Sequence, residues 1–181
     1  MILQGNKIVK QYNHKGGLIN ALDQVSFSVD KGDFVTVTGP SGSGKSALLL
    51  SLFGLIRLSS GTVFFDGKRI DNITDRHLTD IRKKSVGYIL QSFALIPYLS
   101  TIQNVMIPLA LDKISGKEQL KRAAEILDYV GLSDRMEHLP RELSAGQQQR
   151  VAIARSIVHR PQIIMADEPT GNLDPTLSME I

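Results

Sequence analysis

Residues 39–46 read GPSGSGKS, which matches in full the phosphate-binding pattern G-x-x-x-x-G-K-[ST]. The stretch follows a predicted strand at residues 34–38 (FVTVT) and precedes a predicted helical run at residues 47–52, as the pattern requires. From average residue usage, a chance match in a chain of this length falls below ~1%. Its glycines allow backbone N–H groups to converge on phosphate oxygens at a helix N-terminus. The stretch therefore predicts a nucleotide-binding loop in an α/β fold.

Two side chains of this loop have a predicted chemical role. Lys45 pairs with the β- and γ-phosphates of a bound nucleotide, and the Ser46 hydroxyl ligates Mg²⁺. We expect the nucleotide to contact the whole loop and the residue that follows it: Gly39, Pro40, Ser41, Gly42, Ser43, Gly44, Lys45, Ser46 and Ala47.

A pair of acids follows an apolar run near the other end of the chain, where residues 163–168 read IIMADE. Ligands bind beyond the carboxyl ends of strands in open α/β sheets, and phosphoryl transfer needs one acid near the metal and another near the attacking water. Asp167 fits the first role, and Glu168 fits the second as general base. The alternative is a solvated acidic turn, with Pro169 ending the strand. The phosphate-binding loop in the same chain favours the functional interpretation.

The remaining strand signals fall into two kinds. Residues 25–29 (VSFSV) alternate with period two, and residues 62–65 lead into an Asp66-Gly67 turn, so we expect an antiparallel β layer near the N-terminus. Residues 86–90 and 163–166 are short and nearly all apolar, which is typical of parallel strands buried on both faces. The predicted fold class is α/β, with a mostly parallel core sheet.

Residues 92–158 contain no convincing strand and are predicted to be a mostly helical insertion. Ser115 and Glu118 fit a capping box before a helix of period 3.6 that ends at Gly131. Residues 144–147 (SAGQ) fit a second capping box, before an apolar helical face. This second helix start has two interpretations, because Ser144 can cap the helix and a helix N-terminus can also bind an anion. The residues by themselves do not choose between them.

Bulk composition indicates a single domain of 181 residues with a net charge of +3. We divide it into a β layer and phosphate-loop core (1–91), the helical insertion (92–158) and a C-terminal acidic part (159–181). No apolar run approaches the roughly 18 residues that cross a bilayer, so a membrane role needs a partner. The N-terminus lacks the apolar stretch of a signal peptide and the chain has no cysteine, which predicts a cytoplasmic protein. The basic run at residues 82–84 is expected to be a solvated face, with no nucleic-acid partner.

In their order along the chain, these motifs resemble those of the ATP-binding cassette (ABC) family of transporter ATPases, over essentially all 181 residues. GPSGSGKS is similar to the Walker A motif, IIMADE to Walker B, and LSAGQQQR at residues 143–150 to the LSGGQ signature. Gln91 falls at the Q-loop, Tyr12 at an aromatic position that stacks on adenine, and residues 171–174 (GNLD) at the D-loop. Within the family, the run QSFALIP, the string ADEPTGNLD and the short helical insertion are most similar to lipoprotein-release and macrolide-exporter ATPases.

The resemblance implies an ABC-type ATPase that binds ATP and Mg²⁺ and drives a membrane transporter. It implies a head-to-tail dimer, or a pseudo-dimer with a similar ATPase, in which the signature of one subunit completes the ATP site of the other. It further implies that the helical insertion docks on an integral membrane subunit at the inner face of the membrane. The residues that match the family's functional positions are Glu168, Lys45 and Gln91 for catalysis, Ser46, Gln91 and Asp167 for the metal, and Tyr12, Ser144, Gly146, Gln147 and Asp174 for nucleotide contacts outside Walker A.

Three departures from the family pattern set further expectations. Ala47 replaces the usual threonine, which removes a hydrogen bond worth about 0.5–1.5 kcal/mol, and Ala145 replaces the first signature glycine. Family members carry a γ-phosphate histidine beyond Walker B, on a strand of the core sheet, and this sequence ends at Ile181 before such a residue. We expect a piece of a longer protein or a shortened one, and an isolated chain that is unstable or aggregates.

Two alternative functions remain open at this stage. The first is a catalytically impaired module that senses ATP and docks on membrane partners without full turnover. Intact Glu168 speaks against it and the missing histidine speaks for it. The second is an ATPase of the chromosome-maintenance type. Those proteins carry long coiled-coil or zinc-binding insertions, which this sequence does not contain.

Overall fold

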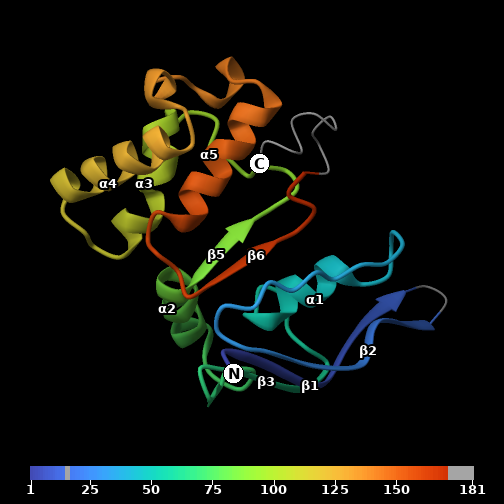
Figure 1. Cartoon of the computed structure of the whole chain (residues 1–181). Helices are drawn as coiled ribbons and strands as arrows, with labels where there is room; N and C mark the ends of the chain where they lie inside the picture. Colours follow the sequence, from blue (N-terminus) through green and yellow to red (C-terminus); the bar gives the residue numbers. More distant parts are fainter. Residues whose placement is uncertain (15–16, 171–181) are drawn as a thin grey trace. The chain divides into compact units, whose positions relative to one another are not determined.

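The computed structural model describes residues 1–14 and 17–170, and the chain divides into two compact units, Met1–Asp80 and Ile81–Ile181 (Figure 1). Helix α2 (Asp75–Ser85) contains the boundary between them. In the part of the chain that is described, no helix is both long enough and apolar enough to span a membrane.

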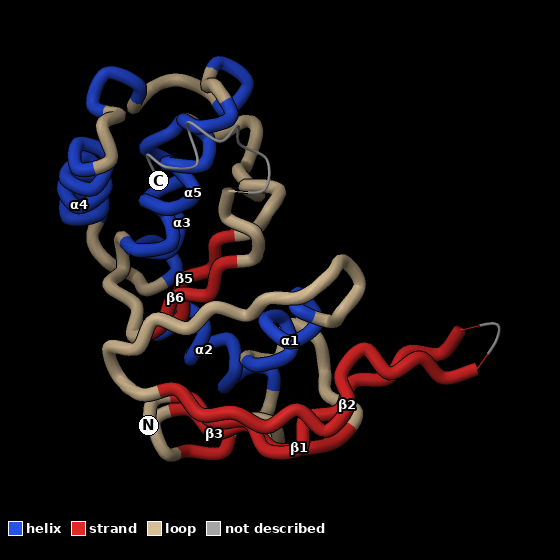
Figure 2. Tube along the Cα trace, turned by 45° about the vertical axis from the view of Figure 1, so that its right-hand side comes forward, coloured by secondary structure: helices blue, strands red, loops and turns tan. Residues whose placement is uncertain are grey.

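The first unit is built on an antiparallel sheet of order β2-β1-β3-β4 (Figure 2). Its strands are β1 (Leu3–His14), β2 (Gly17–Val29), β3 (Ser60–Phe65) and β4 (Lys68–Arg69). The predicted N-terminal antiparallel layer is confirmed, including the strand at residues 25–29 and the hairpin turn at residues 66–67. Strand β1 was not predicted, because its pairing with β2 shifts register three times and its sequence lacks a clean alternation.

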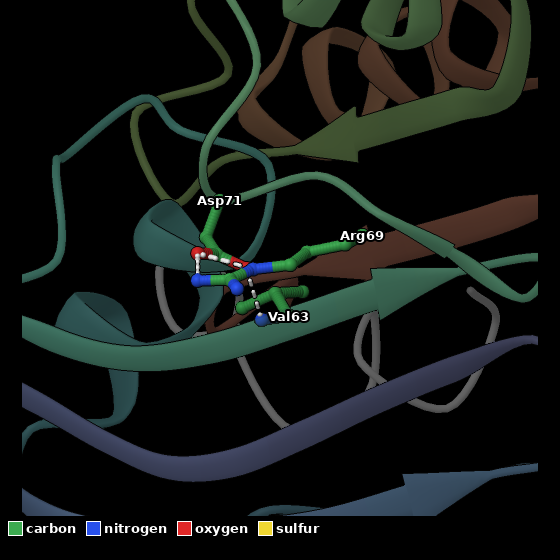
Figure 3. Close-up of polar contacts among 3 residues, drawn as sticks. All are labelled: Val63, Arg69 and Asp71. Atoms are coloured by element: carbon green, nitrogen blue, oxygen red, sulfur yellow. Dashed lines mark hydrogen bonds and ion pairs between the residues drawn. The ribbon is translucent and has the colours of Figure 1, made fainter.

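An ion pair between a half-exposed arginine and a largely covered aspartate fastens the β3–β4 hairpin of this sheet. The Asp71 carboxylate accepts hydrogen bonds from the Val63 backbone N–H at 2.8 Å and from Arg69 Nη2 at 2.9 Å (Figure 3). Arg69 Nε also donates to it, so the arginine binds the carboxylate with two nitrogens. Burial raises the pKa of Asp71, but these hydrogen bonds outweigh it and hold the pKa below its ordinary value.

Helix α1 (Lys45–Leu52) lies over one face of the sheet, which confirms the helix predicted after the phosphate-binding loop (Figure 2). The helix ends at Phe53, whose fully buried ring meets Phe65 of β3 edge to face, with 5.0 Å between ring centroids. Apolar side chains from the strands and from α2 complete this core: Ile2, Leu3, Ile8, Leu22, Val63, Ile70 and Leu78.

The predicted strand at residues 34–38 is wrong. This segment joins neither of the sheets in the described part of the chain, and the Phe34 side chain is 96% exposed. An alternating sequence becomes a strand only when a neighbouring strand takes up its backbone hydrogen bonds. The alternation of FVTVT therefore predicted a strand that has no partner strand among the described residues.

The second unit contains a parallel pair of strands, β5 (Val86–Ile89) and β6 (Ile163–Ala166), with Val86 opposite Ile163 and Ile89 opposite Ala166. Both predicted strands and their parallel pairing are therefore confirmed. Burial on both faces holds for β5 but not for β6, since Ile164 is half exposed.

Residues 92–158 are mostly helical, as predicted. The helices are α3 (Thr101–Leu111), α4 (Gly116–Tyr129) and α5 (Ala145–Ile157), with short 3₁₀ turns at Ser133–Arg135 and Pro140–Glu142. Their shared core is apolar and consists of Ile102, Val105, Leu109, Ala123, Leu127, Leu132, Leu143, Val151, Ala154 and Val158. The Val151–Ala154–Val158 face that the sequence predicted for α5 is buried in it.

The capping box predicted at Ser115 is wrong, although α4 does begin there. Ser115 stands at the N-cap without a side-chain hydrogen bond, and the Glu118 carboxylate instead accepts from Arg122 Nε at 2.7 Å. An ion pair one turn along the helix replaces the bond back to the cap. A capping box that was not predicted, Ser100 with Gln103, starts α3.

Candidate functional site

The phosphate-binding loop leads directly into α1 in the first unit. Gly44 is the N-cap of that helix and Lys45 is its first residue. The Lys45 ammonium donates to the carbonyl oxygens of Gly39 at 2.9 Å and Pro40 at 3.1 Å, so the side chain folds back over its own loop. Residues 39–43 are exposed, which leaves this surface of the loop open to a ligand.

Glycine is required at two positions of the loop for different reasons. Gly42 and Gly44 have φ of 81° and 94°, in the left-handed region that side chains disfavour. A Cβ at Gly44 would also collide with the Ala21 carbonyl of β2, whereas a Cβ at Gly42 would meet open space. The loop therefore packs directly against β2, at the contact between the Gly44 backbone and the Ala21 carbonyl.

Tyr12, predicted to stack on adenine, lies on β1 opposite Ile19 of β2. Because Ile19 and Ala21 are two residues apart on one strand, Tyr12 and the Gly44 contact are separated by about 7 Å along β2. The ring is 41% exposed, and the Lys10 ammonium lies 4.7 Å from its centroid. The first unit therefore brings the predicted adenine and phosphate contacts to the same stretch of β2.

In the second unit, Gln91 and Glu168 follow the two parallel strands and meet at their carboxyl ends. Gln91 Nε2 donates to Glu168 Oε2 at 3.0 Å, across 77 residues of sequence. The Asp167 backbone N–H donates to the Ile89 carbonyl at 2.9 Å, so the pairing of β5 and β6 continues up to the acids. Glu168 itself has φ of 46°, a left-handed conformation that non-glycine residues rarely adopt. Such backbone outliers cluster at functional sites.

The signature stretch begins α5, and its predicted capping box is confirmed. The Ser144 hydroxyl accepts from the Gln147 backbone N–H at 3.3 Å, and the Ser144 N–H donates to the Gln147 side chain at 3.0 Å. Ser144 is exposed and Gly146 is buried. The hydroxyl proton of Ser144 remains available as a donor to a ligand, since the capping bond uses only the hydroxyl oxygen, as an acceptor. The anion-binding interpretation of this helix start stays a prediction.

The D-loop residue Asp174 lies outside the described residues. Between residues 1–14 and 17–170, no group of three or more His, Cys, Asp or Glu side chains could hold a metal by itself.

Two residues of α5 that sequence reasoning missed contact the loops bearing Gln91 and Glu168. Arg155 donates to the carbonyls of Phe93 and Ala94, and Gln149 donates to the carbonyl of Pro169. The sequence offered no clear signal for them, because Gln148, Arg150 and Ser156 of the same helix are polar as well.

The model of the ABC transporter family matches residues 22–171. This chain belongs to the ABC transporter family. The matched range takes in the phosphate-binding loop, Gln91, the signature stretch and the two acids.

Relatives of this ABC domain span most of its length. An uncharacterized ABC transporter ATP-binding protein of Thermotoga maritima is 46% identical over 163 residues, which cover 90% of this chain and 70% of that protein. The lipoprotein-releasing system ATP-binding protein LolD of Francisella tularensis subsp. holarctica is 44% identical over 182 residues, covering 100% of this chain and 79% of that protein.

Solved structures agree in fold. A dimeric ATP-binding cassette in a post-hydrolysis state, bound to ADP and Pi, superposes with a TM-score of 0.92 at 38% identity, covering 99% of this chain and 79% of that one. A dimeric bacterial ABC transporter cassette gives 0.93 at 39% identity, over the same shares of both chains. The predicted family, fold class and activity are confirmed: the chain is the ATP-binding and ATP-hydrolysing domain of an ABC transporter.

Proposed function

We propose that this ABC domain hydrolyses ATP with Glu168 as general base and with Gln91 orienting the reacting groups. The observation that carries the proposal is the 3.0 Å hydrogen bond between these side chains at the carboxyl ends of adjacent parallel strands. Ligands of open α/β sheets bind at such strand ends. Glu168 takes a proton from a water molecule, the water oxygen attacks the γ-phosphorus, and the bond to the leaving ADP oxygen breaks.

The loop Gly39–Ser46 binds the nucleotide phosphates, and the Lys45 ammonium turns from its own loop toward them. The carbonyls of Gly39 and Pro40 now occupy this ammonium, at 2.9 and 3.1 Å. These neutral acceptors give way to phosphate oxygens, because an ammonium group binds an anionic oxygen more strongly than a neutral carbonyl. Tyr12 contributes its exposed ring to adenine stacking, and Lys10 against that ring adds positive charge.

The donor chemistry of Ser46, Gln91 and Asp167 fits Mg²⁺. Hydroxyl, amide and carboxylate oxygens are hard ligands, and Mg²⁺ is commonly held by one or two carboxylates together with substrate phosphates. When bound, Mg²⁺ neutralises charge on the β- and γ-phosphate oxygens.

The signature stretch serves the ATP site of a second subunit in a head-to-tail dimer. Ser144, Gly146 and Gln147 begin a helix of 13 residues whose positive dipole end is accessible to an anion through the exposed Ser144. The dimeric state of the solved cassettes supports the assembly. Asp174 is proposed to join the same contact.

The membrane partner and the cellular location are inferred from relatives. LolD proteins are named as ATP-binding components of lipoprotein-releasing systems, and this chain is 40–44% identical to two of them. We propose that it works at the cytoplasmic face of a membrane, bound to an integral membrane subunit, and powers extraction or export of a related apolar substrate.

ATPase assays of the wild type beside Glu168→Gln test the proposal. The variant should lose turnover by about 10²–10⁴-fold, since a general base of this kind contributes that much, while it still binds ATP. Glu137→Gln, at an exposed acid of the same unit, serves as control and should behave as wild type. ATP binding without turnover in the wild type would instead support the alternative of an ATP-sensing module.

A further inference from the structure

Helix α5 contacts both loops that carry the proposed reacting pair. Arg155 Nη1 donates to the Ala94 carbonyl at 2.6 Å, and Nη2 donates to the Phe93 carbonyl at 2.7 Å. These carbonyls lie two and three residues beyond Gln91. The planar guanidinium thus binds two neighbouring carbonyls at once, a geometry that lysine cannot reproduce.

The loop that Arg155 binds has an unfavourable backbone. Phe93 and Ala94 have φ of 58° and 50°, two consecutive left-handed residues with side chains. The Phe93 N–H closes a turn onto the Leu90 carbonyl at 3.0 Å, and Gln91 lies inside that turn. A turn of this kind persists only when its surroundings hold it, and Arg155 supplies two hydrogen bonds for that purpose.

Gln149 makes the corresponding contact on the other loop. Its side chain is 1% exposed, and Nε2 donates to the carbonyl of Pro169, the residue after Glu168. Leucine or methionine would fill the same space with apolar atoms. A glutamine in this interior is costly unless its hydrogen bond matters, since its Oε1 has no partner in the described part of the chain.

The helix that carries both side chains is itself fixed against β5. A Cβ on Gly87 would collide with the Ser156 carbonyl, so the end of α5 lies directly on the strand. Val151 and Ala154 of α5 are completely buried in the helical core. Arg155 and Gln149 therefore extend from a rigid support.

We infer that Arg155 and Gln149 are positioning residues, which set the approach of Gln91 to Glu168 by fastening both loops to α5. This inference rests on the proposed roles of Gln91 and Glu168. Helix α5, which begins with the signature stretch, then also supports the hydrolytic site of its own subunit. Arg155 lies eleven residues past Ser144 on this helix.

The test is a double-mutant cycle on steady-state ATPase activity, with ATP affinity and thermal melting measured for every variant. Arg155→Met should lower kcat about 10- to 100-fold with unchanged ATP affinity, because small misplacements of reacting groups have effects of this size. Arg155→Lys should recover part of the loss. In a Gln91→Ala background, Arg155→Met should cause little further loss. Arg160→Met, at an exposed arginine beyond α5, is the matched control.

Gln149→Leu gives an independent arm, because leucine keeps the volume and removes the amide. It should lower kcat without lowering the melting temperature, whereas a purely structural glutamine would leave kcat unchanged. If Arg155→Met does not fold, Arg155→Lys takes its place in the cycle.

The inference would be overturned if the fold-losses in kcat of Arg155→Met and Gln91→Ala simply multiplied in the double variant. A wild-type kcat in Gln149→Leu would overturn it as well. If Gln91→Ala by itself leaves kcat unchanged, the proposed role of Gln91 is what fails.

Discussion

The side chains of Gln91 and Glu168 are joined by a 3.0 Å hydrogen bond across 77 residues of sequence. Each follows one strand of a parallel pair, and the strand register continues to the Asp167 N–H, which donates to Ile89. An amide just beyond the end of the neighbouring strand thus orients the carboxylate that is proposed as base.

Shortening the Glu168 side chain tests how strongly kcat depends on the position of its carboxylate. Glu168→Asp keeps the charge and tolerates the left-handed backbone at φ 46°, but withdraws the carboxylate by one methylene. We expect kcat to fall by about 10²-fold or more, with ATP affinity unchanged. Steady-state ATPase and nucleotide titration measure both. Glu137→Asp is the control, and equal activity of Glu168→Asp and wild type would contradict the assignment.

The contact of the phosphate-binding loop with β2 predicts a difference between two glycine substitutions. Gly42→Ala places a methyl in open space at φ 81° and should cost about 1–2 kcal/mol of strain. Gly44→Ala adds a collision with the Ala21 carbonyl to a similar strain, so it should destabilise the first unit more and weaken ATP binding more. Urea unfolding and nucleotide titration compare the two. Equal effects would show that the Ala21 contact is unimportant.

The β3–β4 hairpin should depend on the charge of Asp71. Asp71→Asn loses the charge-assisted bonds from Arg69 and should reduce the free energy of unfolding by about 1–3 kcal/mol. Asp75→Asn, which breaks an exposed ion pair with Arg57, should cost about 0–1 kcal/mol. Because the folded pKa of Asp71 is lowered, its contribution is present above the ordinary value of 3.8 and is lost as pH falls through the folded pKa. Urea unfolding at pH 7 and below pH 4 measures both effects.

His159 should make the protein sensitive to mild acid. Burial lowers the pKa of His159 below its usual 6.5, although the hydrogen bond to the Val86 carbonyl and the charge of Asp112 oppose this. The folded state then binds fewer protons than the unfolded one, so stability is present above pH 6.5 and declines as pH falls below it.

His159→Gln keeps a donor for Val86 and should flatten this decline, as seen in urea midpoints at pH 7.5 and 5.5. His77→Gln, at an exposed histidine, should decline as wild type does. An unchanged slope in His159→Gln would contradict the prediction.

The sequence by itself determined the family and the position of the local elements that carry the candidate site. The phosphate-binding loop, the Ser144 cap and the strand with its two acids are local features, because turn geometry, capping and apolar runs act over a few residues. They were located correctly without tertiary information. The same local logic failed for Ser115, where the ion pair of Glu118 with Arg122 replaces the capping bond.

Tertiary structure decided whatever needed a distant partner. Residues 34–38 carry a strand pattern but form no strand, since backbone hydrogen bonding in a sheet depends on a neighbour that the pattern does not specify. The bond between Gln91 and Glu168 and the hold of Arg155 on Phe93 and Ala94 join segments more than 60 residues apart. Spacing in the sequence predicts which groups a site contains. Only the pairing of β5 with β6 and the packing of α5 against β5 bring them within hydrogen-bonding distance.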